Sequence, residues 1–288
     1  MELGKPIVDI IRARYSCRTY EDRPIQDELR QRLSSFIAST TTGPFGNGAR
    51  FELAAATAED RAALKGLGTY GFIRGATAFL IGAIKTSDGD MEDYGYLMER
   101  IILFATGLGL GTCWLGGSFT KSSFAHKISA RDGELVPAVA SVGYIAPSPR
   151  LVESLIRRGA ASDKRLPWQR LFFDGSFDSP LSPKAAGAHA VPLEMVRLGP
   201  SASNKQPWRI VRSGNTWHFF LQRNRGYGQG RLRKTWAVAD MQRIDMGIAM
   251  CHFELAAREL GLEGYWLRDE PAIARPDELT QYTVSWIG

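Results

Sequence analysis

The chain has 288 residues, of which 44% are hydrophobic and 23% are charged, and its formal net charge is +6. This composition is too apolar and too weakly charged for a disordered chain, and 30 glycines and 14 prolines without a period exclude a collagen-like or low-complexity chain. The length allows one large domain or two of ordinary size. The small positive charge permits an anionic ligand or a nucleic-acid surface, although no run of like charges marks a polybasic arm.

The cysteines and histidines show neither a disulfide framework nor a metal site. Cys17, Cys113 and Cys251 are far apart and form no C-x-x-C pair, and the four histidines have no metal-ligand spacing. We therefore expect a reducing, cytoplasmic location, and the first residues lack the pattern of a signal peptide. The uncharged stretch Ile101–Phe119 is nearly long enough to span a bilayer, but five glycines interrupt it, which favours a helix followed by a turn and a strand.

The hydropathy pattern predicts helices interleaved with few strands, and hence an α+β fold. In chain order, the expected elements are a helix at Ile7–Arg14, a helix at Asp27–Thr40 with Asp27 as N-cap, a strand at Phe51–Ala56, a short helix at Ala58–Gly66, a strand at Ala76–Ile84, a long helix at Glu92–Thr106, strands at Thr112–Leu115 and Val136–Ile145, a hairpin of Trp208–Val211 and Thr216–Gln222 turning at Gly214 and Asn215, a long helix at Asp240–Leu260 and a final strand at Tyr282–Ile287.

Two stretches of the sequence repeat one pattern. Tyr94–Gly117 and Arg243–Asp269 each contain a long apolar helix, a glycine suited to end it, a short turn and a Trp-Leu pair that we expect in a buried strand. Two copies half a chain apart predict a duplicated unit, with a boundary in the Pro-, Gly- and Ser-rich stretch Asp174–Ala190. The expected halves are residues 1–173 and 174–288. The alternative is chance similarity between two helix–turn–strand units.

Two segments carry groups suited to a ligand. In an extended chain, residues two apart point the same way, so Arg14, Ser16 and Arg18 can converge on one phosphate. Gly199–Trp208 is a loop rich in amides and hydroxyls that can hydrogen-bond the edge of a heterocycle. The alternatives are a solvated surface segment for the first and an ordinary turn for the second.

Two further segments offer backbone access and positive charge. The paired glycines in Trp114–Ser118 let a ligand approach the backbone closely, unless they only form a tight turn. The preceding glycines follow a helix and are therefore not a dinucleotide-binding fingerprint. The basic pair in Asp163–Trp168 can close over a phosphate, and the alternative is a surface charge pair.

Together these four segments resemble the flavin-dependent nitroreductase family. The shared motifs are R-x-S-x-R, the loop P-S-x-x-N-x-Q-P-W, a long helix ending in G-L-G-x-x-W-L-G-G, a V-G-Y strand and a late K-R-L-P segment. One motif is displaced. Where the family has its P-S-x-x-N loop, the first half has the degenerate Thr42–Gly48, and the intact loop lies in the second half. The second half lacks R-x-S-x-R, and its counterpart of W-L-G-G, Trp266–Asp269, reads Trp-Leu-Arg-Asp.

The resemblance implies a nitroreductase-like α+β fold in which two tandem related halves form an intramolecular pseudo-dimer. Family members are homodimers with FMN at the interface, so a monomeric pseudo-dimer would keep one of two sites. The residues that would contact FMN are Arg14, Tyr15, Ser16 and Arg18 of the phosphate segment, Leu115, Gly116 and Gly117 near flavin N5, Lys164 and Arg165 at the phosphate, and Pro200, Ser201, Ala202, Ser203 and Asn204 along the ring. The family places further flavin contacts near Thr69 and Tyr70.

The resemblance also implies an enzyme with ping-pong kinetics. NADH or NADPH would donate a hydride to flavin N5, and a nitroaromatic, quinone or similar small molecule would accept it, with no catalytic side chain required. The second hypothesis is a flavin-binding or flavin-sensing protein without turnover. A nucleic-acid-binding protein is a third class, but no recognised motif or Lys/Arg stripe supports it, so we expect neither nucleic acid nor membrane as partner.

Overall fold

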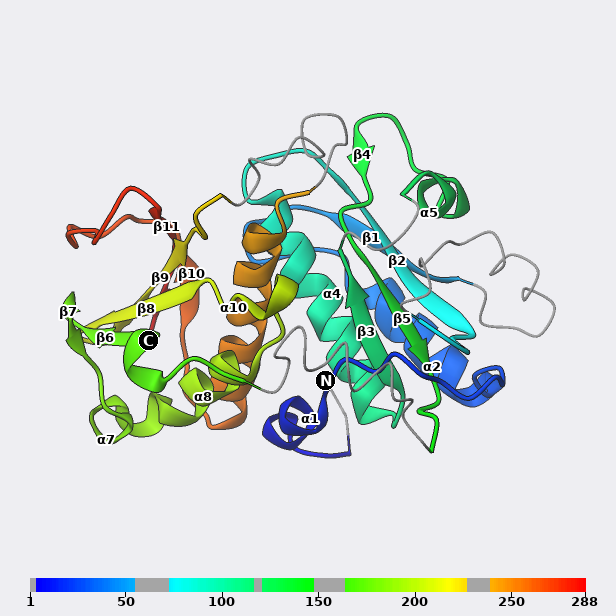
Figure 1. Ribbon diagram of the computed structural model, residues 1–288, viewed down its shortest axis with the longest axis horizontal. Helices are drawn as coiled ribbons and strands as arrows, with labels where there is room; N and C mark the ends of the chain where they lie inside the picture. The colour runs from blue at the N-terminus through cyan, green and yellow to red at the C-terminus, as the bar shows by residue number, and fades with distance from the viewer. Residues whose placement is uncertain (1–3, 55–72, 117–120, 148–163, 227–238) are drawn as a thin grey trace.

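The computed structural model describes residues 4–54, 73–116, 121–147, 164–226 and 239–288, and the expected helix at Ala58–Gly66 lies outside these ranges. Two sheets lie on opposite sides of a central pair of long helices (Figure 1). The described helices are α1 (Ile7–Ala13), α2 (Asp27–Ser39), α4 (Asp90–Gly107), α5 (Lys121–Lys127), α7 (Pro183–Ala186), α8 (Ala190–Leu198) and α10 (Met241–Glu259). The described strands are β1 (Ala49–Ala54), β2 (Ala78–Lys85), β3 (Gly111–Leu115), β4 (Glu134–Leu135), β5 (Val139–Gly143), β6 (Phe172–Asp174), β7 (Ser176–Pro180), β8 (Trp208–Ser213), β9 (Thr216–Gln222), β10 (Tyr265–Leu267) and β11 (Thr280–Ile287).

The two sheets share one topology. The first has the order β1-β2-β5-β3, and the second contains β8-β9-β11-β10 with every one of these neighbours antiparallel. In each half the long helix follows the second strand, α4 after β2 and α10 after β9. This correspondence confirms the duplicated α+β unit that the repeated sequence pattern predicts.

The stretch Asp174–Ala190, expected as a boundary, contains regular structure. It includes β7 and α7, and Ser182 caps α7 by accepting a hydrogen bond from the backbone N–H of Ala185 at 3.1 Å. β6 precedes this stretch, pairs in parallel with β8 and thereby extends the second sheet. The second sheet therefore takes in Phe172 and Phe173, which lie before the expected boundary.

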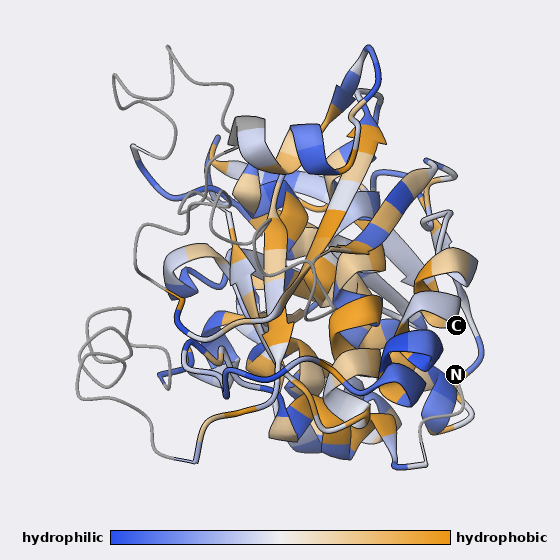
Figure 2. Cartoon of the chain, turned by 90° about the vertical axis from the view of Figure 1, so that its right-hand side faces the viewer, coloured by the Kyte–Doolittle hydropathy of each residue, from blue (hydrophilic) through white to orange (hydrophobic). Residues whose placement is uncertain are grey.

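The central helix α4 is buried along almost its whole length, because α10 covers one side and the first sheet covers another. Apolar residues line the central strands and the helix behind them, while polar residues gather on the outer segments (Figure 2). A helix buried on all sides needs a partner for each polar side chain that it carries. The acidic residues of α4 find these partners in the other half and in the loop before β1, as described below.

The glycines that we expect to end the long helices do so. Gly109 after α4 and Gly261 after α10 adopt positive φ angles of 84° and 70°, which glycine tolerates without strain. The uncharged stretch Ile101–Phe119 is accordingly divided between α4 and β3. Among the described residues, no helix combines the length and apolar character that crossing a membrane requires.

The expectation of a buried strand after each long helix is correct for β3 and wrong for β10. The side chains of Tyr265 and Leu267 in β10 are 58% and 42% exposed. The outer edge of β3 is covered because Ser16 forms a parallel bridge with Thr112. β10 ends its sheet, and the second half has no R-x-S-x-R segment to cover it.

The other predicted elements are present with shifted ends, and the hairpin of β8 and β9 turns at Gly214 and Asn215 as expected. Asp27 is not an N-cap: Gln26 holds that position without a side-chain hydrogen bond, and Asp27 is the first helical residue. The sequence patterns did not indicate α5, α7, α8, β4, β6 or β7. No cluster of histidine, cysteine or acidic residues suited to a metal ion occurs in the described ranges.

Candidate functional site

The segment Arg14–Arg18 runs along β3. Arg14 follows the last residue of α1, and beyond it the backbone N–H of Cys17 donates to the carbonyl of Thr112 at 2.9 Å. Arg18 folds back, and its Nη1 donates to the Ser16 carbonyl at 3.3 Å. Tyr15 is 36% exposed, so this segment lies between the buried β3 and the surface.

The guanidinium of Arg14 is buried without adequate partners. Its side chain is 4% exposed, and Nε lies 3.9 Å from Oε1 of Glu99, which is too long for a hydrogen bond. Nε and Nη1 have no hydrogen-bond partner. Burial lowers the pKa of Arg14, and the carboxylate of Glu99 opposes that shift. Buried donors without acceptors are costly, so this position is suited to a bound anion with several acceptor oxygens.

The loop Gly199–Trp208 has a strained backbone. Ser203, Asn204 and Gln206 have φ angles of 50°, 54° and 49°, and they are three of the four non-glycine residues with positive φ in the described part of the chain. Such conformations persist where surrounding contacts hold them, and they are frequent at binding sites. The carboxylate of Asp245 in α10 provides such a contact by accepting the backbone N–H of Ala202, at 3.0 Å and 3.2 Å from its two oxygens.

Hydrogen bonds within the loop fix it further. The hydroxyl of Ser201 accepts the backbone N–H of Gln206 at 2.8 Å, and Gln206 is buried. Pro200, Ser201, Ala202 and Asn204 are half-buried, and Ser203 is exposed. The loop therefore presents its middle residues to solvent on a backbone held from beneath.

The basic pair predicted at the phosphate lies against this loop. Nη1 of Arg165 is 3.2 Å from Oδ1 of Asn204, and Nη2 donates to the carbonyl of Leu198 at 3.0 Å. The side-chain amide of Asn204 donates to the backbone carbonyl of Lys164 at 2.8 Å, while the Lys164 side chain is exposed. The structure thus brings two of the four segments together, although they are far apart in the sequence.

The glycine strand meets the second half at the start of α10. Leu115 is buried, and a side chain at Gly116 would overlap the Met241 side chain, so only glycine fits there. Gly117 lies outside the described residues, as do Thr69, Tyr70 and Asp163.

A buried network connects the phosphate segment to the loop of the second half. Glu99 of α4 lies 3.9 Å from Arg14, as given above, and its Oε1 is 2.9 Å from Nε2 of His252 in α10. The other ring nitrogen of His252, Nδ1, is 2.8 Å from the carbonyl oxygen of Met195 in α8, the helix that leads into the loop. α1 also packs against α8. The arginine segment and the serine loop therefore lie at two ends of one buried network.

The sequence analysis did not select Glu99, His252 or Asp245. Glu99 and His252 are single polar residues within apolar helical runs, and this is the signal that could have indicated buried, partnered groups. The identity of their partners depends on how the two halves pack, which no local pattern shows.

The degenerate loop Thr42–Gly48 is held in the same way as the intact one. Asp93 of α4 accepts the backbone N–H groups of Phe45 and Asn47, both at 2.9 Å, as Asp245 accepts that of Ala202. Burial raises the pKa of Asp93, and it raises the pKa of Asp245 well above its usual range. Two buried aspartates thus play equivalent parts on opposite sides of the molecule.

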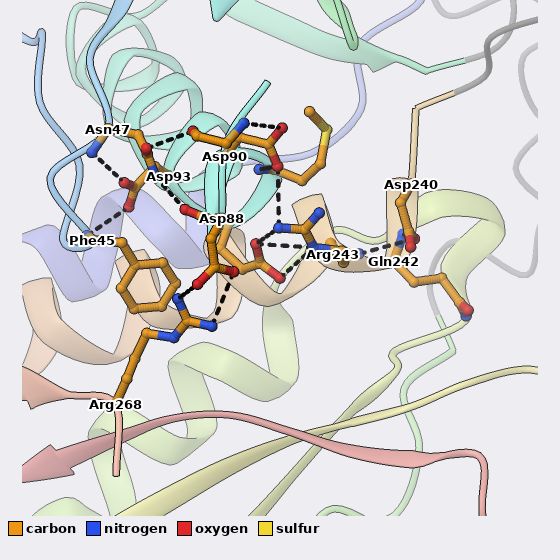
Figure 3. A network of polar contacts seen from close by, with 12 residues as sticks. Phe45, Asn47, Asp88, Asp90, Asp93, Asp240, Gln242, Arg243 and Arg268 are labelled. Atoms are coloured by element: carbon orange, nitrogen blue, oxygen red, sulfur yellow. Dashed lines mark hydrogen bonds and ion pairs between the residues drawn. The ribbon is translucent and has the colours of Figure 1, made fainter. Parts of the chain in front are cut away.

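Side chains fill the region beside the degenerate loop (Figure 3). Arg268, which takes the place of Gly116 in the second copy, pairs with Asp88 at 2.5 Å and stacks over the ring of Phe45 at 5.0 Å. Arg243 pairs with Glu92 at 2.6 Å and with Asp90 at 3.1 Å. A polar cavity of about 210 Å³ remains between these groups. Each of these ion pairs joins the two halves, so this side is a polar contact between them.

Two antiparallel sheets around a pair of crossing helices, repeated within one chain, define a nitroreductase-like α+β fold. The family model described as "Putative TM nitroreductase" matches residues 6–257. The chain belongs to this family. No curated protein matches it.

Solved structures of nitroreductases share this fold. A "putative nitroreductase" from Thermotoga maritima MSB8 is 18% identical, covers 98% of this chain and 94% of its own, and has a TM-score of 0.60. A nitroreductase family protein from Clostridium difficile 630 is 19% identical, with 56% and 92% of the two chains covered and a TM-score of 0.41. An NADPH:FMN oxidoreductase from Vibrio harveyi, complexed with NAD+, is 17% identical, with 52% and 75% covered and a TM-score of 0.40.

Proposed function

We propose that this chain is an FMN-dependent oxidoreductase that takes a hydride from NADH or NADPH and reduces a small-molecule acceptor such as a nitroaromatic or a quinone. The observation that carries the proposal is the buried guanidinium of Arg14, whose Nε and Nη1 lack hydrogen-bond partners. Membership of the nitroreductase family makes FMN the expected anion. The phosphate oxygens of FMN are acceptors of the kind that Arg14 lacks.

The chain's own residues would hold the cofactor in three places. Arg14, Ser16 and Arg18 would bind the phosphate and ribityl region, together with Arg165 and Lys164. The loop residues Pro200, Ser201, Ala202, Ser203 and Asn204 would cover the isoalloxazine ring, and backbone N–H groups at Leu115, Gly116 and Gly117 would lie near flavin N5. Gly116 fits this role because its missing side chain leaves the end of β3 narrow and accessible.

FMN, when bound, supplies the redox chemistry of a ping-pong cycle, in which hydride is accepted from the nicotinamide and then passed to the second substrate. The protein would position the ring and stabilise the negative charge of its reduced form with N–H donors and cationic groups near the pyrimidine. No side chain needs to act as a general acid or base in this scheme.

The proposal places one FMN in each chain, within a monomer made of related halves at residues 1–173 and 174–288. The second position would bind no flavin, because Arg268 and its ion pairs fill the region equivalent to the glycine strand. A cytoplasmic location is part of the proposal and agrees with three free, buried cysteines.

Titration of apoprotein with FMN, followed by anaerobic mixing with NADH and NADPH in a stopped-flow instrument, tests the proposal. We expect one FMN per chain and rapid loss of oxidised-flavin absorbance with at least one donor. A protein that is colourless and takes up no added FMN contradicts the whole proposal. Bound FMN that neither donor reduces would favour the flavin-binding protein without turnover, which the degenerate second position also permits.

A further inference from the structure

Glu99 is a fully buried carboxylate with fixed partners on both of its oxygens. Oε2 accepts the indole N–H of Trp114 in β3 at 2.7 Å, and Oε1 lies 2.9 Å from Nε2 of His252. The guanidinium of Arg14 approaches the same Oε1 from the phosphate segment at 3.9 Å. Three parts of the chain, including one from the second half, therefore meet at this carboxylate.

His252 is fixed as firmly as the carboxylate. Its Nδ1 lies 2.8 Å from the carbonyl oxygen of Met195, and a carbonyl only accepts hydrogen bonds, so Nδ1 carries a proton. Nε2 then shares a proton with Oε1 of Glu99 across 2.9 Å. The carboxylate cannot rotate away from Arg14 without breaking hydrogen bonds in a fully buried site, and such networks hold side chains in one geometry.

We propose that Glu99, fixed by Trp114 and His252, is a positioning residue that directs the guanidinium of Arg14 toward the phosphate of bound FMN. This inference rests on the proposed function. At 3.9 Å the carboxylate attracts the guanidinium without forming a hydrogen bond, so the arginine N–H groups stay available for the phosphate. Without the carboxylate, Arg14 would be a buried cation without a nearby anion and would reorient toward solvent.

The other long helix provides a matched control. Glu254 of α10 accepts the indole N–H of Trp266 at 2.6 Å and the hydroxyl of Tyr96 at 2.8 Å, so it joins its own strand to the opposite helix as Glu99 does. Its arginine partner, Arg258, comes from the same helix and is 49% exposed at the side chain. Glu254→Gln therefore alters a buried glutamate of the same kind without affecting Arg14.

The experiment compares FMN with riboflavin, which lacks the phosphate, in titrations of the apoproteins followed by quenching of flavin fluorescence. For Glu99→Gln we expect FMN binding to weaken roughly tenfold or more, the size expected for a displaced hydrogen bond between charged groups. Riboflavin affinity should stay within about twofold, since the ring contacts are unchanged. Glu254→Gln should keep both affinities of the unaltered protein.

The ratio of the two affinities separates positioning from general damage. If Glu99→Gln folds and keeps the preference for FMN, or if it weakens both ligands equally, the positioning role is wrong while the flavin site stands. If the unaltered protein binds neither ligand, the proposed function itself fails. Should Glu99→Gln not fold by circular dichroism, His252→Gln serves in its place, because it leaves the carboxylate but removes its support. It should then lower the FMN preference, and an unchanged preference overturns the inference.

Discussion

Gly95 of α4 and Gly247 of α10 sit at the crossing of the two central helices, and each lies against the backbone of the other helix. A side chain at Gly95 would overlap the carbonyl oxygen of Ile244, and one at Gly247 would overlap that of Glu92. The spacing from Gly95 to Gly247 equals that from Glu92 to Ile244. The two contacts are thus related as in the interface of a two-fold symmetric dimer, here within one chain.

Replacing Gly247 with alanine should therefore destabilise the fold. The new methyl group meets backbone atoms that cannot move aside, and overpacking of this kind costs about 1–3 kcal/mol. Urea unfolding measures the difference. Gly48→Ala is the control, because its nearest neighbour would be the Thr41 carbonyl oxygen at 3.9 Å. Equal stability of the two variants would show that the helix crossing tolerates a wider separation.

The ion pairs beside the degenerate loop should differ in their contribution to stability. The side chain of Arg243 is 28% exposed and faces Glu92 and Asp90, which are 8% and 4% exposed. Arg243→Met leaves two carboxylates without their cation, and we expect a loss of about 3 kcal/mol in the free energy of unfolding. Arg268 and Asp88 are 44% and 81% exposed, so Arg268→Met should cost less than about 1 kcal/mol.

Unfolding of both variants at low and high salt measures this contrast. The small effect of Arg268→Met should shrink further in salt, because exposed charges are screened. FMN content should stay at one per chain in Arg268→Met, since the region around Phe45 also lacks the arginine segment. Uptake of a second FMN by that variant would show that Arg268 alone closes the second position.

The duplication could be predicted from the sequence because it depends on local pattern. The apolar period of α4 and α10 and the glycines Gly109 and Gly261 that end them are visible in the letters. The exposure of β10 was not predictable in this way. It depends on whether another segment covers the edge of the sheet, and that is a property of the assembled fold.

Prolines hid part of the second half. α7 and α8 carry Pro183 and Pro192 in their first turns, where the missing N–H has no partner to lose. In the sequence these prolines, with nearby serines and glycines, indicate a linker. The partners of Glu99 and His252 were equally hidden, because they come from segments brought together only when the two halves pack.

Asp245 should make stability depend on pH. Burial raises its pKa well above the usual range, so the folded protein holds the proton more tightly than the unfolded chain does. The stabilisation is full below the unfolded pKa of about 3.9 and is lost as pH rises toward the folded value. Asp245→Asn removes this loss and keeps an acceptor for the N–H of Ala202.

Urea unfolding of the variant and of the unaltered protein at about pH 5 and about pH 8 tests this sign. We expect the stability of Asp245→Asn relative to the unaltered protein to increase with pH. Asp178→Asn, at an exposed position, is the control and should show no such trend. A constant difference would mean that the Asp245 carboxyl stays ionised in the folded protein throughout this range.

The arginines of the phosphate segment provide the direct test of the cofactor site. Arg14→Ala and Arg18→Ala should each weaken FMN binding by about 1.5–3 kcal/mol, the range for one hydrogen bond to a charged group. Asn47→Ala should have little effect on FMN, since its side chain bonds only to the Asp88 carbonyl and the Ser87 hydroxyl, at 2.9 Å and 2.6 Å. Equilibrium dialysis of each apoprotein against FMN gives the affinities. If Asn47→Ala lost FMN while both arginine variants kept it, the cofactor would lie on the opposite side of the molecule, beside the degenerate loop.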